Sequence, residues 1–276
     1  MKVLFLCPFW GQEHLSPGDF LQKVQNAGYD GVEIHLPADE TWVSSFTREL
    51  NSLRSQRPFF VVAQCIPSHE PGETVEGFLH KTRQLLQAAT RIAPDLINAH
   101  TGTDYFSFED NCRCIEACTL FSEEKGIEVL HETHRGRFSF HAPTLIPYLD
   151  RYPLLSLTAD FSHFCVVSER MLQGQEAVLA QIAARSAHVH ARVGFEQAPQ
   201  VADPFAPEWE DHFARFTAWW SDLIQARQQA GQKVLTITPE CGPAPYMPRL
   251  PFTNQPIGDQ WSINLRMMTH LRALFT

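Results

Sequence analysis

The feature that most constrains the fold is a regular alternation of short apolar runs with longer helical stretches. The runs are rich in β-branched residues and nearly continuous in apolar character, which is typical of parallel strands buried on both faces. The predicted strands are Val3–Leu6, Gly31–Leu36, Phe59–Cys65, Leu96–His100, Gly126–Glu132, Leu154–Asp160, Ala187–Arg192 and Val234–Glu240. A helical stretch follows each run, so the chain is predicted to repeat a βα unit eight times.

The number and length of these units favour a closed barrel. The predicted helices are Gly18–Ala27, Thr41–Leu53, Thr74–Ile92, Phe108–Lys125, Pro143–Tyr152, Glu169–Arg185, Trp209–Ala230 and about Gln260–Leu274. An open doubly wound sheet usually has a glycine-rich turn after its first strand, whereas here the sequence reads CPFWGQEH. We therefore expect an α/β fold, one (β/α)₈ TIM barrel domain over residues 1–276, with Pro243–Pro256 as a long loop after the last strand.

Composition and charge narrow the function classes. Apolar residues make up 44% of the chain and charged residues 19%, as in globular enzymes. The net charge of −9 disfavours nucleic acid and anionic membranes as partners. The apolar start MKVLFLCPFW is interrupted by Pro8 and too short for a membrane span, so we expect a cytoplasmic protein without a membrane partner. The odd number of cysteines favours a reduced protein, with Cys112, Cys114 and Cys118 as small buried helix residues.

Polar side chains stand at the end of nearly every predicted strand, where the active sites of such barrels lie. These residues are Glu33, His35, Gln64, His100, Glu132, Asp160, His163, His188, His190 and Glu240. Carboxylates and imidazoles that converge in a barrel mouth are costly unless a cation lies among them. The pattern predicts one divalent metal held by Glu132, Asp160, His190 and Glu240. Oxygen-rich ligation favours Mn²⁺ or Mg²⁺, with Co²⁺ or Zn²⁺ as alternatives.

Each of these residues also has a plain structural interpretation. A glutamate such as Glu132 commonly pairs with an arginine, and a lone histidine commonly bonds to a backbone carbonyl. His188 and His190 share the same parity along their strand, so both could face inward. His190 is preferred as the ligand because it lies nearer the strand's C-terminal end, and His188 is expected to be a buried, hydrogen-bonded core residue.

Four motifs resemble one family in their order along the chain. They are HETHRGR with Glu132, DFSH with Asp160, HVH with His190 and TPECG with Glu240. The chain resembles the xylose-isomerase-like barrels, which include ketose 3-epimerases, hydroxypyruvate isomerases, inosose dehydratases and enzymes of the endonuclease IV type. The resemblance implies that the two glutamates both bind metal and exchange protons, whereas Asp160 and His190 only hold the metal.

The resemblance and the position of the barrel mouth also suggest substrate contacts. By the resemblance, His163 would hydrogen-bond a substrate hydroxyl and Arg192 would contact a substrate oxygen. We also expect His100 and Trp10 at the mouth to bind substrate. The aromatic residues expected around the mouth would either stack on a sugar or pack the rim; these are Phe9, Trp10, Trp42, Tyr105 and Phe106.

The leading hypothesis is a divalent-metal-dependent isomerase or epimerase that acts through an enediolate on a small sugar or polyol. The alternatives are a dehydratase of inosose type, a metal-dependent phosphodiesterase or endonuclease, and a barrel that only binds. Intact strand-end carboxylates count against the last. Gln64, where the DNA-repair members have histidine, counts against an endonuclease. A homo-oligomer is possible, because the aromatic helix Trp209–Trp220 could form an interface, although it could equally belong to the core.

Overall fold

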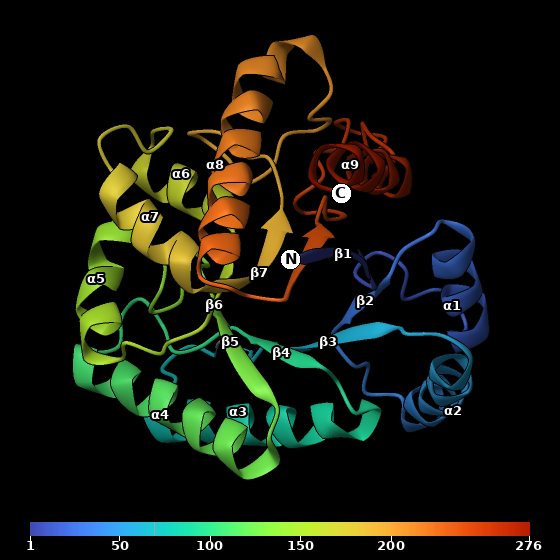
Figure 1. Ribbon diagram of the computed structural model, residues 1–276, viewed down its shortest axis with the longest axis horizontal. Helices are drawn as coiled ribbons and strands as arrows, with labels where there is room; N and C mark the ends of the chain where they lie inside the picture. The colour runs from blue at the N-terminus through green and yellow to red at the C-terminus, as the bar shows by residue number, and fades with distance from the viewer. Residues whose placement is uncertain (69) are drawn as a thin grey trace. The chain divides into compact units, whose positions relative to one another are not determined.

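Eight parallel strands form a closed barrel in sequence order in the computed structural model, which describes residues 1–68 and 70–276 (Figure 1). The strands are β1 (Lys2–Pro8), β2 (Gly31–Ile34), β3 (Phe60–Cys65), β4 (Leu96–Ala99), β5 (Glu128–Glu132), β6 (Leu157–Ala159), β7 (Ser186–Ala191) and β8 (Val234–Pro239). Every predicted strand is present, and the predicted α/β class and TIM barrel fold are confirmed. Within such a barrel the C-terminal ends of the strands carry the chemistry.

The chain divides into two compact units, and strands pair in parallel within each of them. Unit 2 comprises Leu6–Glu132 with Gly136–Ser139. In it the end of β1 and strands β2, β3, β4 and β5 pair in parallel in that order, for example with Leu6 opposite Gly31. Unit 1, Met1–Phe5 with Thr133–Arg135 and Phe140–Thr276, joins β6, β7 and β8 to the start of β1. That the whole chain acts as a single domain stays a prediction.

The helices of unit 2 begin where short polar side chains cap them. These helices are α1 (Pro17–Asn26), α2 (Glu40–Gln56), α3 (Val75–Ala89), which continues as the 3₁₀ turn η1 (Thr90–Ile92), and α4 (Phe108–Lys125). Ser16, Asp39, Thr74 and Ser107 each accept a hydrogen bond from a backbone N–H of the first turn. The apolar faces pack in pairs, α1 with α2 and α3 with α4. Cys112, Cys114 and Cys118 are buried along α4, as predicted.

The helices of unit 1 differ from the prediction at one point. They are α5 (Ala142–Arg151), α6 (Phe161–Ser168), α7 (Glu176–Arg185), α8 (Glu210–Gln229), which follows the 3₁₀ turn η2 (Pro207–Trp209), and α9 (Gln260–Phe275). The predicted single helix Glu169–Arg185 is wrong. Asp160 caps α6 immediately after β6, and the left-handed backbone of Glu169 (φ 49°) ends it before α7 begins. The DFSH motif therefore opens a helix.

Buried aromatic side chains form part of the interior of unit 1. On α8, Phe216, Trp219 and Trp220 are all buried, and α8 packs against both α7 and β7 (Figure 1). The aromatic stripe of this helix thus belongs to the core. Among the helices formed by residues 1–68 and 70–276, none has the length and apolar character to cross a bilayer. The cytoplasmic location and the homo-oligomer stay predictions.

Gly31, at the start of β2, is required by close backbone packing. A Cβ there would lie 2.0 Å from the carbonyl oxygen of Phe60 and 2.9 Å from Cδ2 of Leu6. We predict that Gly31→Ala lowers the free energy of unfolding by about 1–3 kcal/mol, because the neighbouring strand must move. Urea unfolding measures the loss. Gly77→Ala is the control, because its Cβ would meet only the ends of the Glu73 and Thr74 side chains. Equal stability of the two variants would contradict the prediction.

Candidate functional site

Three of the four predicted ligands meet in unit 1. Asp160, His190 and Glu240 follow or end β6, β7 and β8, and each offers a ligand atom within 4.8 Å of the others. Their exposed fractions are 0%, 1% and 4%. Nδ1 of His190 lies 2.8 Å from Oε2 of Glu240. Two buried carboxylates and an imidazole at this separation are a donor set that fits a divalent ion.

Asp160 is held from both sides. Its Oδ1 accepts hydrogen bonds from the backbone N–H of Ser162 at 3.0 Å and from the hydroxyl of Ser162 at 2.5 Å, which makes Asp160 the N-cap of α6. Its backbone is tied to the hydroxyl of Thr133, which donates to the Asp160 carbonyl at 3.0 Å and accepts from the Asp160 N–H at 2.8 Å. The cap fixes the carboxylate orientation and accounts locally for the start of α6.

The backbone after Glu240 is clamped by two buried amide side chains. Asn264 on α9 accepts from the N–H of Cys241 at 2.7 Å and donates to its carbonyl at 3.0 Å. Gln200 makes the same pair of bonds with Gly242, at 2.6 and 3.1 Å. These four bonds satisfy the backbone N–H and carbonyl groups of Cys241 and Gly242 and so restrict the movement of the adjacent Glu240.

Arg192 connects the two carboxylates of this group. Its Nε donates to Oδ2 of Asp160 at 3.1 Å, and its Nη2 donates to Oε2 of Glu240. The guanidinium lies 4.6 Å from the centre of the Tyr246 ring, and its residue is 3% exposed. The sequence predicts a substrate contact for Arg192; the structure shows it on two predicted metal ligands, where it neutralises and orients them.

His163 lies in this cluster with two residues that the sequence analysis missed. His163 is fully buried in α6, with Nε2 3.5 Å from Oδ2 of Asp160. Its ring packs on His134 with centroids 3.9 Å apart, and Nε2 of His134 lies 3.5 Å from the Tyr246 hydroxyl. Burial raises the pKa of Tyr246. His134 stands only two residues after Glu132, and this position near the end of a predicted strand could have marked it as a candidate site residue. Tyr246 lies in a proline-rich loop without a motif that would have singled it out.

Glu132, the fourth predicted ligand, ends β5 in unit 2 and is 1% exposed. Its Oε2 accepts from Nδ2 of Asn98 at 2.8 Å and lies 2.9 Å from Nε2 of His100. His100 was predicted to bind substrate; here it contacts Glu132. The same amide of Asn98, together with Gln64, also donates to Glu33. Glu132 therefore belongs to a polar network with Asn98, His100, Gln64 and Glu33.

His188 has the contacts of a structural residue. Its Nδ1 lies 2.7 Å from the hydroxyl and 3.1 Å from the carbonyl oxygen of Thr236, and its Nε2 lies 3.4 Å from the hydroxyl of Thr238. These bonds lie within the barrel strands, and the residue is fully buried. These contacts are those expected of a hydrogen-bonded core histidine, and the choice of His190 over His188 as the metal ligand stays a prediction.

Most of the aromatic residues expected at the mouth pack against neighbouring rings. Phe9 contacts Phe20 and Trp42, each with centroids 4.9 Å apart, and Phe106 packs edge-on against Phe78. Trp10, predicted to bind substrate, lies partly buried in the turn after β1. Tyr105 is 60% exposed. A sugar-stacking role for Trp10 stays a prediction.

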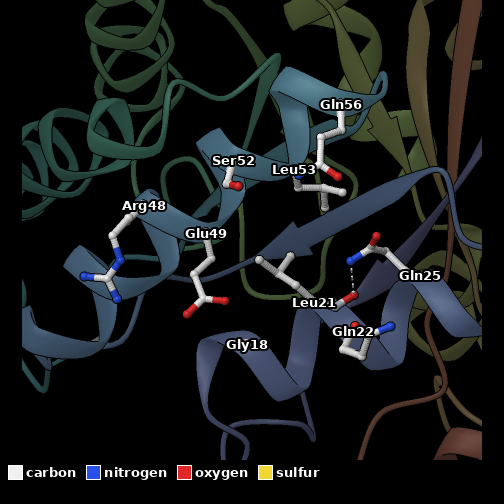
Figure 2. Close-up of a pocket in the computed structure, with 9 residues that line it drawn as sticks. All are labelled: Gly18, Leu21, Gln22, Gln25, Arg48, Glu49, Ser52, Leu53 and Gln56. Carbon is white, nitrogen blue, oxygen red and sulfur yellow. Dashed lines mark hydrogen bonds between the residues drawn. The ribbon is translucent and has the colours of Figure 1, made fainter.

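A separate pocket lies between α1 and α2 in unit 2 (Figure 2). Figure 2 shows that Gln22, Gln25 and Gln56 line it together with Arg48 and Glu49. Gln25 donates to the carbonyl of Leu21 within its own helix. The lining belongs to two outer helices and lacks the buried ionisable groups that the strand ends carry, so this pocket is not the candidate active site.

Searches of family models and of curated proteins give no match. Similar solved structures are xylose-isomerase-like TIM barrels, among them epimerases, a dehydratase and an endonuclease IV. The probable 3-DHS dehydratase AsbF of Bacillus anthracis is 17% identical, with a TM-score of 0.64 over 98% of this chain and 99% of that chain. The D-allulose 3-epimerase of Methylomonas sp., solved with D-allulose, is 14% identical, with a TM-score of 0.65 over 99% and 97%.

A third similar structure contains magnesium. The xylose-isomerase-like TIM barrel protein of Mycobacterium smegmatis, in complex with magnesium, is 9% identical, with a TM-score of 0.61 over 99% of this chain and 98% of that chain. At these identities the likeness shows the fold alone. The family resemblance expected from the sequence motifs is therefore confirmed at the level of fold, and the activity has to be argued from the site.

His131, which precedes Glu132 on β5, makes stability depend on pH. It is buried, its Nδ1 lies 2.7 Å from the Thr101 hydroxyl, and burial lowers its pKa to about 4. As the pH falls, His131 binds a proton near pH 6.5 in the unfolded chain but only near pH 4 in the folded chain. The neutral, buried His131 therefore contributes fully to stability above pH 6.5, and this contribution is lost as the pH falls from 6.5 to about 4.

We predict that His131→Asn removes about 2 kcal/mol of the stability difference between pH 7 and pH 5. Urea unfolding at both pH values measures it. The exposed His80→Asn is the control and should leave the difference unchanged. An unaltered pH dependence in His131→Asn would show that other groups cause it.

Proposed function

We propose that this protein is a divalent-metal-dependent isomerase or epimerase of a small sugar or polyol, with Glu132, Asp160, His190 and Glu240 as its metal ligands. The observation that carries the proposal is the buried group of Asp160, His190 and Glu240, with ligand atoms within 4.8 Å of one another at strand ends. Glu132 is included because the next residue, Thr133, is hydrogen-bonded to the backbone of Asp160 through its side chain.

The proposed ligands favour a hard or borderline ion. Three carboxylates and one imidazole suit Mn²⁺ or Mg²⁺, with Co²⁺ or Zn²⁺ as alternatives. Cys241 follows Glu240, but burial raises the pKa of its thiol to about 12, which disfavours a thiolate ligand. When bound, such an ion supplies Lewis-acid stabilisation of the negative charge that develops on the substrate's oxygen atoms.

The side chains of the chain would then move the protons. One of the carboxylates of Glu132 and Glu240 would take the proton from the carbon beside the carbonyl, and the other would return it. Return to the opposite face gives an epimer, and return to the neighbouring carbon gives an aldose–ketose isomer. Arg192 would keep Glu240 oriented, and His163 would bond a substrate hydroxyl. Near-complete burial of these groups excludes water, which strengthens each interaction.

A dehydratase is the second candidate, and His134 favours it. This histidine is only half-buried, packs on His163 and lies close to the Tyr246 hydroxyl, and in a dehydratase it would protonate the leaving hydroxyl group. Loss of water from the same enediolate would make the reaction a lyase step. A phosphodiesterase or endonuclease is less favoured, because the chain carries a net charge of −9.

We predict that Glu240→Gln weakens Mg²⁺ or Mn²⁺ binding and lowers solvent-deuterium exchange into a ketose substrate by about 10²–10⁴-fold. The carboxylate is replaced by an amide of the same shape, so a ligand charge and a proton acceptor are lost together. Metal titration calorimetry and proton NMR in D₂O across ketoses, aldoses and inososes measure the two effects.

Glu208→Gln, on the exposed turn η2, is the control and should bind the metal and exchange deuterium as the parent protein does. Loss of water during the reaction would favour the dehydratase. Failure of the parent protein to bind any divalent ion would contradict the proposal as a whole.

A further inference from the structure

Arg137 is a buried cation with unused hydrogen-bonding capacity. It lies in the loop after β5 and is 5% exposed. Its Nη2 donates to the carbonyl of Pro67 at 3.3 Å, whereas its buried Nη1 has no hydrogen-bond partner among residues 1–68 and 70–276. An unpaired buried guanidinium nitrogen costs free energy, and buried polar groups are nearly always satisfied. A bound ligand group would remove that cost.

The surroundings of Arg137 lie at the strand ends of unit 2. Pro67 follows β3, Asp104 and Tyr105 follow β4, and Glu132 ends β5. Burial lowers the pKa of Arg137 to about 10, while Glu132, Asp104 and Tyr105 are close enough to oppose this shift. Arg137 therefore remains a cation at neutral pH, and it lies beside the carboxylate proposed to bind metal and move a proton.

The same loop carries a second arginine, Arg135. Arg135 is exposed, its guanidinium lies 5.1 Å from the centre of the Tyr246 ring, and it forms no ion pair within the described part of the chain. Some exposed arginines elsewhere are paired, such as Arg91 with Glu40, but Arg48 and Arg83 are exposed and likewise form no ion pair within the described part of the chain, so the case for a ligand depends on Arg137. In a chain with nine more acidic than basic residues, a buried guanidinium whose Nη1 lacks a hydrogen-bond partner indicates a ligand of negative charge.

We infer that the substrate carries a carboxylate or phosphate group, which Arg137 binds through Nη1. The inference rests on the proposed function and adds the substrate class: an acidic sugar or polyol derivative. A guanidinium is the group best suited to planar anions, because its N–H groups donate in parallel to two oxygens. A purely structural Arg137 would hold the Pro67 loop and have no effect on substrate choice.

The test compares a neutral ketose with its acidic counterparts. Deuterium exchange by the Mg²⁺-loaded protein is measured with D-fructose, D-fructose 6-phosphate and D-fructuronate. We expect kcat/KM for one of the two anions to exceed that for D-fructose at least about tenfold. Arg137→Met should abolish this preference by raising KM for the anion more than KM for D-fructose, and Arg137→Lys should restore part of it. The two anions distinguish phosphate from carboxylate recognition.

Binding of inorganic phosphate to the Mg²⁺-loaded protein provides a readout that does not need turnover. Calorimetry should show at least about tenfold weaker binding to Arg137→Met than to the parent protein or to the control Arg113→Met on α4. Circular dichroism checks that each variant is folded.

Equal phosphate affinity in the parent and Arg137→Met, or a preference for D-fructose that Arg137→Met leaves unchanged, would overturn the inference. If the protein exchanges none of the sugars, the proposed reaction fails, and the phosphate titration still decides whether Arg137 is an anion site.

Discussion

The site depends on the pairing of buried carboxylates. Asp160 and Glu240 are almost completely excluded from water, and a carboxylate in such a place is tolerated only with cationic or hydrogen-bonding partners. Arg192 donates to both of them, and Ser162 adds two further bonds to Asp160. These contacts explain why a polar cluster can persist at the ends of apolar strands. They also preorganise the carboxylate oxygens, which a metal site requires.

Glu132 is held by a different kind of partner. Its Oε2 contacts the amide of Asn98 and the imidazole of His100, whereas Glu240 contacts the permanent charge of Arg192. The two carboxylates therefore have unequal hydrogen-bonding surroundings. This asymmetry supports separate proton-transfer roles for the two glutamates in the proposed reaction.

The similar structures include epimerases, a dehydratase and an endonuclease IV at identities of 9–17%, so the barrel itself does not select a reaction. Selection depends on the loops that follow the strands. In this chain the loop after β5 carries His134, Arg135 and Arg137, and the loop after β8 carries Tyr246. Among these side chains, Arg137 is the one from which the substrate class is inferred.

The sequence by itself determined the strand order, the barrel and the strand-end positions of the candidate ligands, because apolar period and chain direction place every strand end at one rim. It did not reveal that Asp160 opens a helix, since a three-residue strand followed at once by a capped helix resembles one apolar run. Nor could it reveal that Arg192 pairs with Asp160 and Glu240, that Tyr246 covers Arg192, or that Nη1 of Arg137 lacks a partner. Those facts depend on contacts between residues far apart in the chain, which only the tertiary structure decides.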